Sequence, residues 1–153
     1  MRSELAPACL SIAPMSSEAV ARVRCFENIL RTFGEVDIAT QHLLHGGMYA
    51  RTVLIPAGVV AIGVLIKAAT ILIVDGDCSL FVGDATVDLS GRHVLAGAPG
   101  RKQAIFARTD TYVTMVLPSM AKSVADAEHG FTDEVDALQS RRRLLKEGAQ
   151  CLV

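Results

Sequence analysis

The feature that most limits the fold of this chain is a regular series of short apolar segments between Tyr49 and Pro118. Val, Ile and Leu dominate these segments, a composition typical of β-strands. Turn sequences such as Asp75-Gly-Asp77 and Gly97-Ala-Pro-Gly100 separate them at intervals of about 8–12 residues. This spacing is typical of a sandwich or barrel and excludes the longer repeat of βαβ units. The sequence therefore predicts a mainly β domain.

The flanks of this region have a different pattern. We expect an extended N-terminal arm at residues 1–15, a helix and lead-in at 16–47, the barrel at 48–118 and a helical segment at 119–153. Ser16 or Ser17 can cap the first helix and Gly34 can end it. Its apolar residues recur at helical spacing and predict one packed face, which comprises Val20, Val23, Ile29, Leu30 and Phe33. After Pro118, we expect a short helix over residues 120–128, a break at Gly130 and a second helix capped by Thr132.

Within the barrel, strands are expected at residues 49–55, 59–66, 71–74, 78–82, 86–89, 93–96, 103–107 and 111–117. Residues 53–74 are long and apolar enough to suggest a membrane span. Pro56, Gly58, Gly63 and Lys67 argue against one, and the strand pattern continues downstream. We therefore expect no membrane association.

Charge and cysteine content narrow the range of partners further. The net charge is −1, so we expect no nucleic-acid partner, and Arg141 to Arg143 read as a solvated helix face. The N-terminus does not resemble a signal peptide, which predicts synthesis in the cytoplasm. The cysteines are widely spaced and predict neither a disulfide framework nor a zinc site; they are Cys9, Cys25, Cys78 and Cys151.

A loose motif runs through the first half of the barrel: His-x-Gly-x-Tyr-x-Arg, an apolar strand, Pro-x-Gly, a second strand and two further glycines. The matching residues are His45, Gly47, Tyr49, Arg51, Pro56, Gly58, Gly63 and Gly76. A Pro-Gly turn, basic residues and a Thr-rich last strand follow downstream. This pattern resembles small cupin-like proteins encoded by tailed bacteriophages and prophages. The resemblance implies a cupin-like jelly-roll barrel and a phage origin.

The chain departs from metal-binding members of that family at the ligand positions. In those proteins, the strand after Pro-x-Gly carries two histidines and a glutamate, and a third histidine follows the second Pro-Gly turn. The corresponding positions here are Ile66, Ala68, Thr70 and Gln103. None of these is a strong metal ligand. The resemblance therefore implies a metal-free barrel without a cofactor, and strand alternation favours Ile66 inside and Lys67 outside.

The remaining polar candidates for a pocket or contact are few: His45, Tyr49, Arg51 and Gln103. Tyr49 and Arg51 are two apart, so they share one strand face. They could bind an anion at a barrel mouth, form a subunit contact or make a structural pair. His42 and His45 could share a metal or stabilise a turn together.

We expect a non-enzymatic virion component, such as a capsid-decoration or tail-associated protein. In this interpretation the barrel is a scaffold, and the flanking helices contact copies of the chain or capsid or tail proteins. It would form a homo-oligomer and move from the host cytoplasm into the virion. The alternative is a small-molecule-binding or enzymatic cupin that takes a sugar or small acid.

Overall fold

The computed structural model describes residues 10–139. Ten strands run along this part of the chain: β1 Leu10–Ile12, β2 Ala39–His45, β3 Met48–Ile55, β4 Val60–Ile62, β5 Thr70–Asp75, β6 Cys78–Val82, β7 Ala85–Leu89, β8 Arg92–Gly97, β9 Ala104–Ala107 and β10 Thr111–Pro118. The helical elements are α1 Ser17–Leu30, η1 Arg31–Phe33, α2 Val124–Phe131 and η2 Val135–Ala137. Cys9, Cys151 and Arg141 to Arg143 lie outside the described residues.

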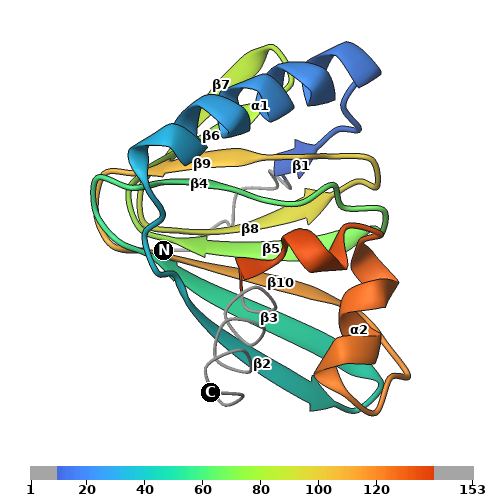
Figure 1. Ribbon diagram of the computed structural model, residues 1–153. Coiled ribbons are helices and arrows are strands. Elements are labelled where there is room, and N and C mark those ends of the chain that lie inside the picture. Colours follow the sequence, from blue (N-terminus) through green and yellow to red (C-terminus); the bar gives the residue numbers. More distant parts are fainter. Residues whose placement is uncertain (1–9, 140–153) are drawn as a thin grey trace, which may run out of the picture.

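The strands form two facing sheets (Figure 1). One has six strands in the order β1-β8-β5-β10-β3-β2, and the other has four in the order β4-β9-β6-β7. The strands β3-β10-β5-β8 facing β4-β9-β6-β7 have the order of an eight-stranded jelly roll. This confirms the predicted fold class, a mainly β, cupin-like jelly roll with an N-terminal helix and a C-terminal helix.

Two strands extend the larger sheet beyond the predicted barrel. β1 lies within the region expected to be an extended arm and pairs in parallel with β8. β2 lies within the predicted lead-in and pairs antiparallel with β3. Gly46 and Gly47, with φ of 59° and 73°, form the two-residue turn between β2 and β3. Such a turn needs two positive φ values, which glycine adopts without strain. The sheet therefore begins well before residue 48.

The expected strand at residues 59–66 is only partly formed. β4 ends at Ile62, and Ile66 makes an isolated bridge with Arg101. Between them, the Lys102 ammonium donates a hydrogen bond to the Gly63 carbonyl oxygen at 2.8 Å. A side chain therefore takes a backbone acceptor that a regular strand would use.

The first helix has the predicted ends. Ser16 accepts a hydrogen bond from the Ala19 amide at 3.1 Å, and Gly34 follows η1 with φ of 91°. Its predicted packed face is partly right: Val20, Val23 and Leu30 are half-buried, whereas Ile29 and Phe33 are 58% and 81% exposed. Figure 1 shows α1 at the side of the smaller sheet, where ion pairs join Glu27 to Lys102 and Arg22 to Asp84.

The predicted break at Gly130 is wrong. α2 begins at Val124 rather than at residue 120, and it runs through Gly130 to Phe131. Phe131 is 1% exposed and stacks on Tyr49 of β3. Burial of this ring outweighs the low helix propensity of one glycine. Of the second predicted helix, the described residues contain only η2.

The core lies between the two sheets and continues under α2. It includes aliphatic side chains of both sheets, such as Val74, Leu80, Leu95 and Val113, together with Phe131. Among the described residues, no helix is long and apolar enough to cross a membrane.

Candidate functional site

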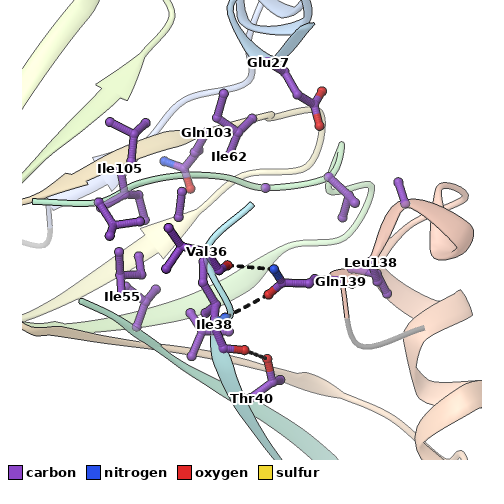
Figure 2. A pocket seen from close by; sticks show the side chains of 18 of the residues that line it. Glu27, Val36, Ile38, Thr40, Ile55, Ile62, Gln103, Ile105, Leu138 and Gln139 are labelled. Carbon is purple, nitrogen blue, oxygen red and sulfur yellow. Dashed lines mark hydrogen bonds between the residues drawn. The ribbon is translucent and has the colours of Figure 1, made fainter. Parts of the chain in front are cut away.

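A cavity of about 540 Å³ lies inside the jelly roll. Its walls are mostly aliphatic and come from β3, β4, β9 and the connection between η1 and β2 (Figure 2). The apolar lining includes Leu30, Val36, Ile38, Val53, Ile55, Ile62, Ile66, Leu72, Ile105, Met115 and Leu138. Its volume and mostly apolar walls lie within the range seen in small-molecule sites, and the cavity is open to solvent.

The connection between η1 and β2 forms one wall of the cavity and is fixed to the C-terminal part of the described chain. The Gln139 amide donates to the Val36 carbonyl oxygen at 2.8 Å and accepts from the Ile38 amide at 2.9 Å (Figure 2). Thr40 adds a hydrogen bond to the Ile38 carbonyl oxygen at 3.3 Å. The Gln139 side chain thus holds the backbone of this connection at two points, Val36 and Ile38.

Arg101 is the most unusual side chain next to this cavity, because it is charged and 0% exposed. Its guanidinium donates to the Thr70 hydroxyl and to the Ala98 carbonyl oxygen, with longer contacts to Gln103 Oε1 at 3.4 Å and the Ala68 carbonyl oxygen at 3.5 Å. Burial lowers the pKa of Arg101 to about 10, well above neutrality. The side chain is therefore a permanent internal cation.

The predicted positions of the lost metal ligands lie around this guanidinium. Ala68, Thr70 and Gln103 each contact it through an oxygen atom, and Ile66 is joined to the Arg101 backbone by a hydrogen bond of 2.8 Å. No group of three or more His, Cys, Asp or Glu side chains among residues 10–139 could hold a metal. The Arg101 guanidinium therefore lies among these four positions. It offers hydrogen-bond donors, whereas a metal ligand must offer a lone pair.

The expected orientation of the neighbouring pair is confirmed. Ile66 lines the cavity, and Lys67 points outward and pairs with Asp133 at 2.6 Å. Arg101 itself was missed by sequence reasoning, which treated it as one of several basic residues after a turn. Its position two residues before Gln103 and directly after the Pro-Gly turn was the available signal.

The four candidate pocket residues do not come together in one site. Arg51 and Gln103 line the cavity. Tyr49 is 0% exposed and lies in the packed core, and His45 lies at the β2–β3 turn beside a separate hollow of about 360 Å³. Only half of the set therefore contributes to the cavity.

Tyr49 and Arg51 do share one face of β3, where both contact Phe131. The Tyr49 ring stacks on it with centroids 6.1 Å apart, and the Arg51 guanidinium lies 5.9 Å from its centroid. Arg51 also pairs with Glu128 at 3.8 Å. This arrangement is the structural pair that we considered, and it anchors α2 to the sheet.

The interpretation of His42 and His45 as a shared metal site or a joint turn contact is wrong. Residues three apart on a strand point to opposite faces. His42 points inward, and its Nδ1 lies 2.7 Å from the Tyr49 hydroxyl. Burial lowers the pKa of His42, and the neighbouring Arg51 lowers it further. Burial also raises the pKa of Tyr49. Both groups are thus kept neutral at physiological pH.

No protein-family model matches the chain, and no curated protein matches it in sequence. Solved structures of cupins are similar to it in fold. A cupin-2 domain protein from Shewanella frigidimarina is 10% identical, with a TM-score of 0.44 over 60% of this chain and 91% of its own. The Cupin_2 domain of an XRE family transcriptional regulator from Enterobacter cloacae is 10% identical, with a TM-score of 0.43 over 52% and 94%.

Salicylate 1,2-dioxygenase from Pseudoaminobacter salicylatoxidans is also similar. It is 13% identical, with a TM-score of 0.47 over 75% of this chain and 35% of that one. One of these cupins is a domain of a transcriptional regulator and another is a dioxygenase. Because proteins of such different function share the fold, the likeness of this chain to them concerns the fold alone.

Proposed function

We propose that this protein is a non-enzymatic structural or assembly protein of a bacteriophage particle, such as a capsid-decoration or tail-associated component. In this proposal, copies of the chain associate through one face of the jelly roll. The sequence motif supports the phage assignment. The self-association is supported by the exposed side chains of the six-stranded sheet.

The outer face of this sheet, on the side away from β4, β9, β6 and β7, is unusually apolar. An antiparallel sheet with one buried face normally carries polar residues on the other. Here the register aligns mostly apolar side chains across five strands on the outer face. Its exposed large residues are Leu43, Met48, Ile71, Val94 and Tyr112, between 47% and 63% exposed. This face is the observation that carries the proposal.

The face suits a second copy of the same chain better than a charged partner. Its central residues between the exposed ones are also uncharged: Ala50, Thr52, Leu54, Ile73, Thr114 and Val116. Its charges lie toward one end, where Asp75 of β5 is paired in register with Arg92 of β8. Two such sheets can pack face to face, as in a sandwich, and bury each other's apolar side chains.

The oligomeric state tests the self-association. Light scattering coupled to gel filtration should give an oligomer for the wild type and a smaller species for Ile71→Lys or Val94→Lys. Phe33→Lys is the matched control, because Phe33 is 81% exposed but lies on η1. A monomeric wild type, or equal effects of all three substitutions, would count against this interface.

The phage assignment needs a separate test. Mass spectrometry of particles purified after induction of the source strain should detect the protein at a constant ratio to the capsid protein. Its absence from such particles, with the oligomer intact, would leave a scaffold without a virion role.

The cavity favours a second candidate function, a small-molecule-binding cupin. The volume of about 540 Å³ and the mostly apolar lining support it. Thermal-shift measurements with small apolar probes would show whether the cavity takes a ligand.

A further inference from the structure

We infer that the cavity binds an amphipathic carboxylate, with its apolar chain among the aliphatic walls and its carboxylate beside Gln103 in the field of Arg101. This inference rests on the second candidate function, binding of a small molecule in the barrel. It is independent of the oligomeric scaffold. Four features carry it: an internal cation, an unused donor on Gln103, apolar walls and the position of the acidic groups.

The cation is not neutralised by a carboxylate in the described residues. The guanidinium nitrogens of Arg101 contact a hydroxyl, two carbonyl oxygens and an amide oxygen, and no ion pair is formed there. A buried charge is costly unless an opposite charge accompanies it. An anion in the adjoining cavity would supply that charge.

One hydrogen-bond donor along the cavity, Nε2 of Gln103, has no hydrogen-bond partner in the described structure. Nη1 of Arg51 also makes no hydrogen bond, but it faces the Glu128 carboxylate at 3.8 Å and is not available to a ligand. Gln103 presents its Oε1 to Arg101 at 3.4 Å, which leaves Nε2 as the end of the amide without a partner. Figure 2 shows this amide among apolar side chains, near Ile62 and Ile105. Buried donors are rarely left unpaired, so an acceptor group is expected beside Nε2 of Gln103.

The rest of the lining restricts the ligand to one with a single polar end. A sugar would bury many hydroxyl groups against aliphatic walls without partners, which is unfavourable. An alkyl or similar chain fits those walls, and its carboxylate would accept a hydrogen bond from the Gln103 amide. Two carboxylates, those of Glu27 and Glu35, also border the cavity. Glu35 is exposed to solvent, and Glu27 is paired with Lys102 at 3.0 Å and Arg31 at 3.2 Å. Ion pairing of Glu27 and solvation of Glu35 weaken the repulsion that either carboxylate would exert on a bound anion.

Octanoate and 1-octanol are the probes, because they share a chain and differ in charge. Isothermal titration calorimetry on the full chain should show octanoate binding at least about tenfold tighter than 1-octanol, as expected for a hydrogen bond to a charged group. Equal affinities would overturn the carboxylate assignment but keep the cavity as a ligand site. Binding of neither probe would overturn both.

Substitutions at Gln103 test the polar end without removing the buried arginine. Gln103→Glu places a negative charge beside Arg101 and should abolish the preference for octanoate, with 1-octanol binding retained. Gln103→Leu removes the donor at similar volume and should weaken octanoate about tenfold while leaving 1-octanol within about twofold. Unchanged octanoate affinity in Gln103→Glu would contradict the inference. Circular dichroism of each variant separates lost binding from lost folding.

Discussion

At the scale of single residues, the close approach of Gly97 to Arg101 makes a sharp prediction. A β-carbon at Gly97 would lie 2.5 Å from Cζ of Arg101, which is hydrogen-bonded and 0% exposed and so cannot move aside freely. Gly97→Ala should lower the free energy of unfolding by about 1–3 kcal/mol, the usual cost of overpacking. Urea denaturation measures it.

Two further measurements serve as controls for the predicted cost of Gly97→Ala. Gly130→Ala lies in α2, where an added β-carbon meets nothing within 4 Å, so it should stabilise the protein by up to about 1 kcal/mol through helix propensity. In an Arg101→Leu background, Gly97→Ala should cost clearly less, because the clashing group is gone. An equal cost in both backgrounds would show that Arg101 is not the cause.

The lowered pKa of His42 leads us to expect that the stability of the protein depends on pH. Burial, followed by Arg51, holds its folded-state pKa below the ordinary value of about 6.5, whereas Glu128 acts in the opposite direction. The unfolded chain therefore binds a proton first, and stability should fall as pH decreases below about 6.5 until the folded-state pKa is reached.

The measurement is the free energy of unfolding at about pH 7.5 and pH 5.5, a window above the ordinary pKa values of Asp and Glu. His42→Gln should remove most of the difference between the two pH values. If His42→Gln shows the same change in the free energy of unfolding between the two pH values as the wild type, other titratable groups cause the pH dependence.

At the scale of elements, α1 is joined to the barrel through a buried ammonium. Lys102 is 2% exposed, and it contacts Glu27 of α1 and the Gly63 carbonyl oxygen. Glu27→Gln should destabilise the protein by about 1–3 kcal/mol, because it leaves a buried charge without its partner. Denaturant unfolding followed by circular dichroism measures this loss.

Lys102→Met is the informative counterpart. It removes the buried charge and keeps the length of the side chain, and Glu27 retains Arg31 at 3.2 Å. Its cost should therefore be smaller than that of Glu27→Gln. A larger cost would mean that the contact with Gly63, rather than the ion pair, holds this region.

At the scale of the whole molecule, association through the outer sheet face would make stability depend on concentration. For a dimer, a hundredfold rise in protein concentration should raise Tm by about 3–5 °C, because binding of a second copy stabilises the folded state. Differential scanning calorimetry of the wild type tests this. Val94→Lys should remove the dependence, whereas Phe33→Lys should keep it.

Much of the fold could be predicted from the sequence, because the alternation of apolar residues and the turn residues act locally. Most barrel strands lie within one or two residues of their expected places, and Ser16 and Gly34 end the first helix as predicted. β1 could not be predicted, because a three-residue segment forms a strand only when a sheet edge such as β8 is available. The helix through Gly130 likewise depends on the burial of Phe131.

Much less of the candidate site could be predicted. The sequence identified Arg51 and Gln103 as candidates, and both line the cavity. It also grouped them with Tyr49 and His45, which lie elsewhere, because strand alternation gives a face but not the neighbours across it. Tyr49 meets His42 and Phe131 only after β2 and α2 have packed onto β3.

By itself, the sequence determined the strand periodicity, the turns and the absence of strong metal ligands at Ile66, Ala68, Thr70 and Gln103. Those are properties of residue type and spacing, whereas the resemblance to cupins implied that these four are the ligand positions. Only the tertiary structure decided that the Arg101 guanidinium lies among these positions, beside a cavity that opens to solvent. The reason is physical: the burial of a charge and the shape of a cavity depend on which segments pack together, and local sequence does not specify that packing.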